Sequence, residues 1–292
     1  MATLKEIKSR IQSIKSTQKI TSAMKMVSSS KLRKAQIQIE RFYPYEQKLI
    51  QILNNFLSAE EENSSIYAEN REVKKVAIIA LSSNSSLCGS FNSNVAKRLA
   101  STIEEYKYLG KENIIVYPLG KKIAQATKKL GFNSAVNYQN LIDKPSYKEM
   151  QVLADEIIGM YRNGEVDKVV LIFHRFKSKS SQVLINQTFL PISLHSPEIR
   201  TEQAKIHSNY LVEPNREVIM SELIPKVLRL TFFTALLDSA ASEHAARTIA
   251  MQIATDNADD LLQELNLQYN KSRQQAITNE LLDIIGGSFG RS

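Results

Sequence analysis

The side chains that could carry out catalytic chemistry are few and scattered along the 292 residues. Cys88 is the single cysteine, so an internal disulfide and a cysteine-rich zinc site are excluded. The four histidines, His174, His195, His207 and His244, have no metal-ligand spacing, and neither HExxH nor GxSxG is present. A Cys/His pair could form only by chance of folding, so we interpret Cys88 as a structural cysteine. We expect no catalytic, metal or cofactor site in this chain.

A turn rich in small residues follows the first apolar run and has the sequence SSNSSLCGSFNSN (82–94). It leads into a helical stretch, and backbone amides at such a turn can hold a phosphate group. The turn contains neither GxGxxG nor GxxxxGK[ST], and PLGKK (118–122) after the second apolar run lacks them as well. We interpret both as structural strand-to-helix turns, with a nucleotide-dependent α/β enzyme as the alternative.

The densest group of polar side chains lies near the C-terminus, in YNKSRQQAITNELLDIIGG (269–287). An amphipathic helix end, with Gly286 and Gly287 as its stop, accounts for the apolar residues of this stretch. The polar side chains are those of Arg273, Gln274, Gln275, Thr278 and Glu280. Their hydrogen-bonding groups exceed what packing requires, so we expect this helix tip to contact another protein.

Composition places the chain among soluble globular proteins of one or two domains, with 43% hydrophobic and 23% charged residues. The longest apolar runs fall far short of the ~18 residues of a membrane-spanning helix. The first residues form no apolar signal core, so the chain is expected to stay in the compartment where it is made.

The net charge of +8 is unevenly distributed along the chain. Residues 1–48 hold eleven Lys or Arg against three Glu, whereas residues 216–292 hold seven Lys or Arg against ten Asp or Glu. The two ends are therefore complementary in charge, which favours their pairing. A basic helix is also typical of nucleic-acid-binding proteins, so a protein that binds nucleic acid with a basic coiled-coil arm is a second hypothesis.

Residues 4–59 contain no glycine and a single proline, Pro44, which predicts a long helix near the N-terminus. From Leu4 to Ile14, apolar residues alternate three and four apart, the spacing of a coiled-coil seam. This register continues through Gln18, Thr21, Lys25 and Ser28 and becomes apolar again at Leu32, Ala35, Ile39 and Phe42. Ile20, Met24 and Val27 form a second stripe, which we interpret as a local change of winding. Pro44 is predicted to kink or interrupt the helix, of which forty residues would span ~60 Å.

A second long helix is predicted near the C-terminus. The chain contains no proline after Pro225 and no glycine between Pro225 and Gly286. Its heptad positions are Val227, Leu230, Thr234, Leu237, Ala241, His244, Thr248, Met251, Thr255, Ala258, Leu262, Leu265 and Tyr269. The seam is small or polar in its middle, like that of the first helix. Two such helices pack most simply on each other in antiparallel orientation, and sixty helical residues would span ~90 Å.

Between the two helices the pattern changes to short apolar runs at 75–81, 113–119 and 168–176, which predict buried parallel strands separated by helices. A fourth run at 181–192 is predicted to pair with the third as a hairpin. The predicted fold is α/β: a long antiparallel coiled coil of the N- and C-terminal helices with an inserted Rossmann-like α/β domain. The predicted boundaries are 1–60 for the N-terminal helix, 70–195 for the inserted domain, 196–215 for a connection and 216–292 for the C-terminal helix.

Four stretches make the chain resemble the gamma subunit of bacterial F-type ATP synthases over essentially its whole length. They are IKSRIQSIKSTQKITSAMKMVSSSKLRKAQ (7–36), SLCGSFN (86–92), ATDNADDLLQELNLQYNKSRQ (254–274) and ITNELLDIIGG (277–287). Two positions depart from the family pattern: residues 84–86 are Asn-Ser-Ser where the family has an acidic–basic pair before its GLCG, and Ser288 replaces the usual alanine. The cysteine-bearing insertion of the chloroplast form is absent, so control by thiol oxidation is not expected.

The resemblance implies that the coiled coil is the central shaft inside a ring of three alpha and three beta subunits, with one copy of this chain per complex. The catalytic sites would then lie on beta, and the chain would be a non-catalytic coupling subunit without a cofactor. The inserted domain and the middle of the shaft would bind the epsilon subunit and the c-ring, which proton or sodium flow turns. The chain would lie on the cytoplasmic face of the cell inner membrane, attached only through the complex, and would bind no nucleic acid.

The resemblance also places coupling contacts on seven residues, by their position in the family's motifs. They are Lys19, Ile20, Met24, Arg273, Gln274, Thr278 and Glu280. The basic bias of residues 1–48 suits acidic loops in the ring. The small and polar residues of ITSAMKMVSSSKL (20–32) would form a narrow bearing surface, opposite a similarly slim part of the C-terminal helix.

Overall fold

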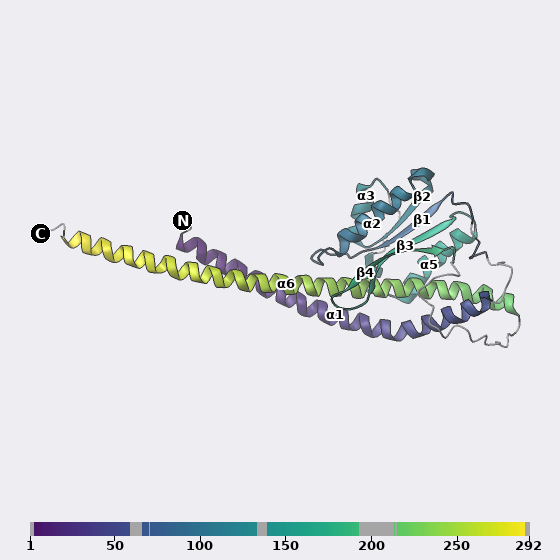
Figure 1. Ribbon diagram of the computed structural model, residues 1–292, viewed down its shortest axis with the longest axis horizontal. Coiled ribbons are helices and arrows are strands. Elements are labelled where there is room, and N and C mark those ends of the chain that lie inside the picture. Colours follow the sequence, from purple (N-terminus) through teal and green to yellow (C-terminus); the bar gives the residue numbers. More distant parts are fainter. Residues whose placement is uncertain are drawn as a thin grey trace. The chain divides into compact units, whose positions relative to one another are not determined.

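The computed structural model describes residues 3–58, 66–69, 71–132, 139–192, 213 and 215–289. They belong to two compact units: Met1–Ser29 with Arg247–Ser292, here called the two-helix unit, and Ser30–Ala246, here called the sheet unit. Two long helices, α1 (Leu4–Ser58) and α6 (Arg216–Phe289), each contribute to both units (Figure 1). The domain boundaries predicted from the sequence stay a prediction, and nearly all of the connection at 196–215 lies outside the described residues.

The sheet unit places four strands between helices in the order that the sequence predicts. Its other elements are β1 (Val76–Leu81), α2 (Phe91–Glu105), the 3-10 turns η1 (Lys107–Leu109) and η2 (Lys111–Asn113), β2 (Ile114–Leu119), α3 (Lys121–Lys129), α4 (Gln139–Asp143), α5 (Tyr147–Arg162), β3 (Lys168–Phe176) and β4 (Gln182–Leu190). The strands lie side by side in the order β2-β1-β3-β4. β1 runs parallel to both β2 and β3, and β4 is antiparallel to β3, so the predicted α/β sheet with a terminal hairpin is confirmed.

Alternate residues of each strand face two separate apolar cores, as buried strands require. On one face, Val76 and Ile78 of β1 pack with residues of α2 and α3. On the other face, Ala77 and Ile79 pack with α5, α6 and the later part of α1. Figure 1 shows α2 and α3 on one side of the sheet and α6 on the other. Leu53 of α1 belongs to the second core, so this long helix is anchored to the sheet by apolar burial.

The turn after β1 is closed by its own side chains. The Asn92 carboxamide oxygen accepts hydrogen bonds from the amide and the hydroxyl of Ser83, at 3.1 and 2.9 Å. Ser82 and Asn84 accept from the backbone amides of Ile123 and Lys121 in the first turn of α3, both at 2.9 Å. At the start of α3 these acceptors occupy amides that a phosphate would need. The observation favours the structural interpretation of the turn before α3 over nucleotide binding.

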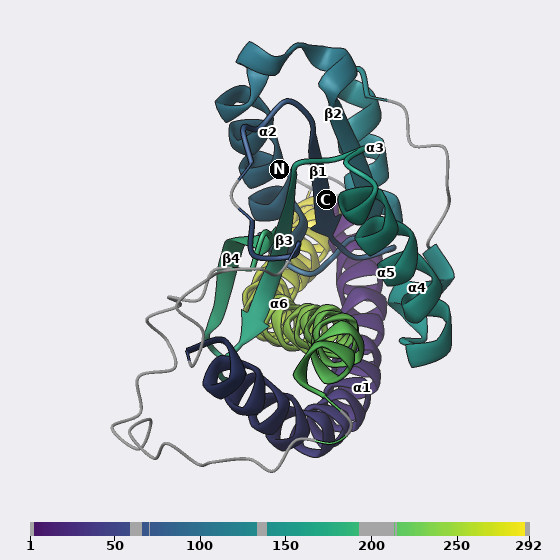
Figure 2. The ribbon, with the colours of Figure 1, turned by 90° about the vertical axis from the view of Figure 1, so that its right-hand side faces the viewer.

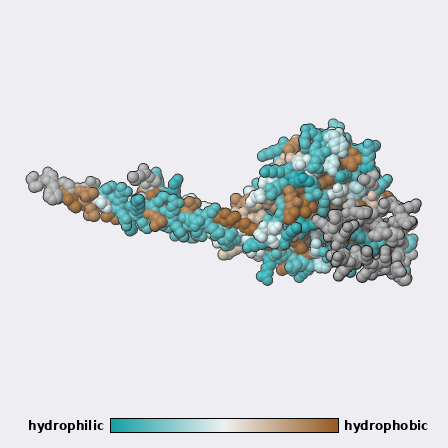
Figure 3. Space-filling view, in the orientation of Figure 1, coloured by the Kyte–Doolittle hydropathy of each residue, from teal (hydrophilic) through white to brown (hydrophobic). Residues whose placement is uncertain are grey.

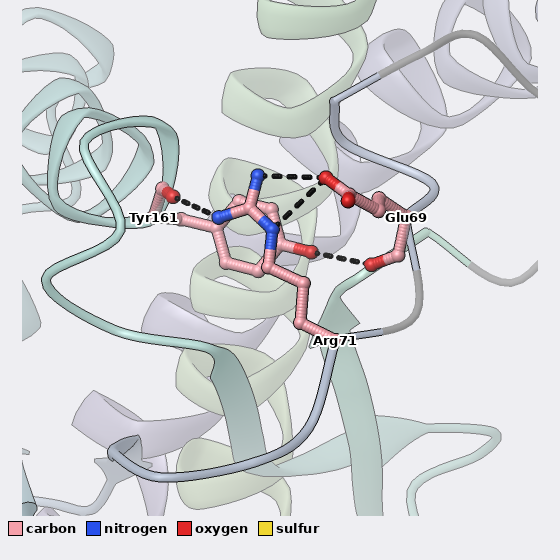
Figure 4. A network of polar contacts seen from close by, with 3 residues as sticks. All are labelled: Glu69, Arg71 and Tyr161. Carbon is pink, nitrogen blue, oxygen red and sulfur yellow. Dashed lines mark hydrogen bonds and ion pairs between the residues drawn. The ribbon is translucent and has the colours of Figure 1, made fainter.

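The segment that leads from α1 into β1 is fixed to the end of α5 by a polar cluster (Figure 4). Arg71 forms an ion pair of 3.0 Å with Glu69, and its guanidinium also donates to the Tyr161 carbonyl at 3.3 Å. The Tyr161 hydroxyl donates to the Glu69 carbonyl at 3.1 Å. The Arg71 guanidinium lies 5.3 Å from the centre of the Tyr161 ring. Because Tyr161 is fully buried, this cluster ties the segment to the core of the sheet unit.

The sequence predicted that Pro44 kinks or interrupts the helix, and an interruption is contradicted because α1 runs through Pro44. Figure 2 shows the later part of α1 curving past α6. Pro44 itself is exposed, while Glu46 and Leu49 beyond it are buried, so packing holds the helix together across the missing hydrogen bond. At the other end, α6 continues to Phe289, beyond the predicted stop at Gly286 and Gly287.

Candidate functional site

The two-helix unit consists of one end of α1 and one end of α6, packed along a heptad seam. Buried side chains recur at the predicted spacing on both helices, including Ile7, Thr21 and Ser28 on α1 and Met251 and Thr255 on α6. The predicted registers of the two helices are therefore confirmed in this unit. Several of the buried positions are polar, which coiled-coil seams normally avoid because burying a polar group without a partner is costly.

Three cross-helix hydrogen bonds satisfy the polar middle of the seam. The Gln18 side chain donates to the Asp259 carboxylate, and Lys25 donates to the Gln252 carboxamide oxygen at 2.9 Å. Between them, the hydroxyls of Thr21 and Thr255 lie 2.9 Å apart. The numbers rise on α1 as they fall on α6, so the helices are antiparallel here, as predicted. The slim stretch 20–32 does begin opposite a slim part of the C-terminal helix.

The second stripe that the sequence suggests on α1 is mostly turned away from α6. Of its three residues, Ile20 and Val27 are 60% and 58% exposed and Met24 is half-buried, and the neighbouring Met26 is 67% exposed. The interpretation of a local change of winding is therefore wrong. The polar heptad positions hold their register through hydrogen bonds, and the apolar residues between them point outward. Three large apolar side chains are thus exposed on this part of α1.

The structure places the seven predicted coupling residues in two separate groups. Lys19 and Ile20 are exposed and Met24 is half-buried, on α1 beside the stretch of α6 from Gln252 to Asp259. If the pairing of Gln18 with Asp259 and of Lys25 with Gln252 is continued along both helices, Leu4 lies opposite about residue 273 of α6. Arg273 thus lies about 30 Å along the helix axis from the level of Met24. The two groups do not form one site.

The second group lies where α6 extends past the first turn of α1 (Figure 1). Gln274, Thr278 and Glu280 are exposed there, as is Arg273. The Thr278 hydroxyl donates to the Gln274 carbonyl one turn earlier at 2.9 Å, so it is held by its own helix. The polar side chains predicted to contact another protein are therefore available on the surface of this unit.

Large apolar side chains are exposed on the same end of α6. Ile277, Leu281, Leu282 and Ile284 have exposed fractions from 48% to 69%. Figure 3 shows the apolar side chains of this end at the surface. The interpretation as an amphipathic helix end would bury Leu281, Ile284 and Ile285, and all three are exposed within the chain itself. Apolar and directional polar groups side by side on one helix are typical of a protein-binding surface.

Of the residues first considered for catalysis, Cys88 and His174 are buried in the sheet unit and His244 is half-buried, while His195 and His207 lie outside the described residues. Cys88 accepts a hydrogen bond from the Asn92 carboxamide at 3.1 Å, which suits the predicted structural role. His174 is 3% exposed and stacks on Phe91 with ring centres 4.4 Å apart. Burial lowers the pKa of His174 to about 4. Among the residues that the structure describes, no group of three or more His, Cys, Asp or Glu side chains is placed to hold a metal ion.

None of the described helices combines the length and the apolar character needed to span a membrane.

Comparison with known proteins decides the family. A family model described as ATP synthase matches residues 3–289. The ATP synthase gamma chain of Phocaeicola vulgatus is 55% identical over 99% of this chain and 99% of its own length. The chain belongs to the ATP synthase gamma chain family. The gamma chains of Bacteroides thetaiotaomicron and Christiangramia forsetii are 55% and 42% identical, each over 99% of this chain.

Solved structures share the fold of this gamma chain. A chain from the F1 and c-ring assembly of the Euglena gracilis mitochondrial ATP synthase has a TM-score of 0.63, with 17% identity over 98% of this chain and 94% of that one. A chain from the central stalk and c-ring of the Tetrahymena thermophila enzyme has a TM-score of 0.57 with 22% identity, over 80% of this chain and 99% of that one. At such identities the likeness concerns the fold, and it confirms the predicted combination of terminal helices with a central α/β sheet.

Proposed function

We propose that this gamma chain is the central rotor shaft of an F-type ATP synthase and couples rotation of a c-ring to conformational change at catalytic sites on beta subunits. The chain itself carries no catalytic residue in this proposal. The asymmetry of the shaft stabilises a different conformation at each of the three beta sites. As the shaft turns, each site passes through these conformations in succession. The direction of rotation decides between ATP synthesis and ATP hydrolysis.

The observation that carries the proposal is the surface of the two-helix unit in a member of the gamma chain family. Its seam is closed by hydrogen bonds, while Ile20, Met26 and Val27 on α1 and the end of α6 face outward. Such a pair of helices has apolar surface on several sides, as expected of an element enclosed by other subunits. The basic residues of α1 would face acidic loops of the enclosing ring.

The partners in this proposal are three alpha subunits, three beta subunits, the epsilon subunit and a c-ring, with one gamma chain per complex. Structural relatives come from assemblies named for a central stalk, a rotor and a c-ring, which supports this context. We propose a peripheral location on the cytoplasmic face of the inner membrane, reached through the complex. The proposed domain roles follow the predicted boundaries, with 1–60 and 216–292 as the shaft and 70–195 as the part near epsilon and the c-ring.

Co-purification tests the assignment to a complex. Tagged chain, expressed in its native host, should recover alpha and beta subunits and an ATPase activity that the chain alone lacks. The rival hypothesis, a nucleic-acid-binding protein with a basic arm, predicts salt-sensitive recovery of RNA or DNA instead. Recovery of nucleic acid without alpha and beta subunits would overturn the rotor proposal.

A substitution at Met24 tests the coupling contacts. Met24→Lys adds a charge to a half-buried position of α1 and should leave helix formation nearly unchanged, since both residues favour helices. We expect ATP hydrolysis by the assembled complex to continue while proton pumping into vesicles falls severalfold, because the added charge perturbs the contact that links rotation to catalysis. Both rates are measured on the same vesicles.

Two matched variants separate the site from general effects. Met24→Leu keeps the volume without the charge, and Ile37→Lys adds the same charge to an exposed α1 position in the sheet unit. Both should pump like the parent complex. If Met24→Lys pumps with the parent ratio of protons to ATP, Met24 is not a coupling contact, and the assignment of Lys19 and Ile20 falls with it.

A further inference from the structure

In the two-helix unit, α1 has two faces that compete for the seam with α6. The polar face consists of Gln18, Thr21, Lys25 and Ser28, and the apolar face consists of Ile20, Met24 and Val27. Each apolar residue directly precedes a residue of the polar face, so a rotation of α1 by about 100° about its axis exchanges the two faces. Burial of apolar surface favours packing of the apolar face. The structure shows the opposite arrangement: Thr21 and Ser28 are buried, while Ile20 and Val27 are 60% and 58% exposed.

The small side chains of the polar face fix the rotation of α1 only weakly. Thr21 and Ser28 are too short to insert deeply between residues of α6, whose buried positions in this unit include Thr248 and Thr255. The Thr21 hydroxyl donates to the Gln18 carbonyl at 3.0 Å, and the Thr255 hydroxyl donates to the Met251 carbonyl at 2.8 Å. Each hydroxyl therefore has an acceptor on its own helix and does not require the other helix.

Two longer polar side chains of α1 do require the other helix. Gln18 donates to the Asp259 carboxylate, and the Lys25 ammonium donates to the Gln252 carboxamide oxygen at 2.9 Å. The Gln252 carboxamide nitrogen donates to the Asp256 carboxylate one turn along α6 at 2.7 Å, which orients its oxygen toward Lys25. A rotation of α1 by about 100° would carry Gln18 and Lys25 away from these acceptors. The two cross-helix contacts therefore oppose the rotation that apolar burial favours.

The predicted coupling residues of α1 all lie between these two contacts. Lys19, Ile20 and Met24 fall in the stretch bounded by Gln18 and Lys25. In the observed rotation Lys19 and Ile20 are exposed and Met24 is half-buried. Exchange of the two faces would turn Ile20 and Met24 into the seam, where no other subunit reaches them.

We propose that Gln18 with Asp259 and Lys25 with Gln252 are positioning contacts, which hold α1 in the rotation that keeps its apolar face exposed. They act through the residues between them and touch no partner themselves. Their role in coupling rests on the proposed rotor function, whereas the rotation of α1 is a property of the isolated chain.

Thiol labelling of the isolated full chain tests the rotation. Val27→Cys places a reactive thiol on the apolar face, while the natural Cys88 is only 1% exposed and reacts slowly. Adding Gln18→Ala and Lys25→Ala removes both contacts with a residue that favours helices. The rate of maleimide labelling at position 27 should then fall severalfold, because this position turns toward α6. Gln12→Ala with Lys15→Ala, which removes the same two side-chain types at exposed positions of α1, should label like the Val27→Cys parent.

A charge change at Gln18 gives a second test in case the double alanine variant fails to fold. Gln18→Glu keeps the size of the side chain and places two carboxylates opposite each other, so labelling at position 27 should again slow. Adding Asp259→Asn restores a donor and an acceptor of the original lengths, and the rate should return to that of the Val27→Cys parent. A merely local loss of helix structure would speed labelling.

The assembled complex, without the Val27→Cys change, tests the positioning role. The ratio of protons pumped to ATP hydrolysed should fall severalfold in Gln18→Glu and recover when Asp259→Asn is added, while hydrolysis continues in both. Labelling that is unchanged or faster in Gln18→Glu would overturn the proposal. Slower labelling with the parent pumping ratio would overturn the positioning role in coupling. Failure of the rotor proposal is seen separately, as the absence of alpha and beta subunits in co-purification.

Discussion

At the scale of single residues, His174 gives the sheet unit a specific sensitivity to acid. Its Nδ1 has no hydrogen-bond partner among the described residues, and its ring is covered by Phe91. Burial lowers the pKa of His174 to about 4, so the folded chain resists the protonation that the unfolded chain accepts near 6.5. The stability contribution of neutral His174 is therefore present above pH 6.5 and is lost as the pH falls toward 4.

His174→Phe should remove this acid sensitivity while keeping the stacked ring. Between pH 6.5 and 4, the free energy of unfolding of the parent should fall relative to the variant by up to about 1.4 kcal/mol per pH unit. Denaturant titrations at each pH measure the difference, and Tyr108→Phe at an exposed site of the same unit is the control. An imidazole resonance of His174 that titrates near pH 6.5 in the folded chain would contradict the prediction.

At the scale of elements, the polar seam between α1 and α6 is a source of register and contributes little net stability. The hydroxyls of Thr21 and Thr255 each also donate to a carbonyl of their own helix, at 3.0 and 2.8 Å. Two hydroxyl protons cannot serve these two carbonyls and the cross-helix contact at once. The cross-helix contact therefore competes with the two carbonyls for the hydroxyl protons, which limits its net contribution to stability.

Replacing both threonines by valine should leave the stability of the chain within about 1 kcal/mol of the parent or raise it, because paired removal of buried hydroxyls leaves no donor unpaired. Thr21→Val with Thr255→Val is compared with the parent by thermal unfolding. Ala241→Val, at a fully buried seam position of the sheet unit, should instead lose about 1–3 kcal/mol through overpacking. A loss above about 2 kcal/mol in the double valine variant would show that the polar pair is a principal stabiliser.

The strands were the most predictable elements. Predicted runs at 75–81, 113–119 and 168–176 match β1, β2 and β3 to within one residue. A strand buried on both faces is nearly continuous in apolar residues, so its apolar run ends close to where burial ends. α4 has only five residues, Gln139–Asp143, and no periodicity to reveal it in the sequence.

The seam of the helices was predictable only in part. The heptad register pointed correctly to buried Thr21 and Ser28, and apolar spacing pointed wrongly to Ile20 and Val27. Sequence periodicity alone does not show whether a polar residue is buried and hydrogen-bonded to the other helix, or whether an apolar residue is exposed on the helix surface. The partner Asp259 of Gln18 lies 241 residues away, beyond the reach of any local pattern.

At the scale of the whole molecule, the chain has surface that its own fold does not bury. The end of α6 exposes Ile277, Leu281, Leu282 and Ile284, where the family resemblance placed ring contacts. Burying a Leu or Ile side chain is worth about 1.5–3 kcal/mol. The isolated chain should therefore self-associate through this end, and assembly with partner subunits should suppress the association.

A double change, Leu281→Gln with Ile284→Gln, tests whether this apolar end is a docking surface. Glutamine keeps helix propensity close to that of the parent residues, so the helix should persist in circular dichroism. Sedimentation of the isolated chain should shift from oligomers toward monomer, and the same variant should recover fewer alpha and beta subunits in co-purification. Asn279→Gln, an exposed polar position of the same turn, should behave like the parent in both assays.

If the parent chain sediments as a monomer at tens of micromolar and the double variant assembles at the parent level, this end of α6 does not dock to the ring. The coupling contacts predicted at Arg273, Gln274, Thr278 and Glu280 would then lose their structural support, while those at Lys19, Ile20 and Met24 would still depend on the pumping assay.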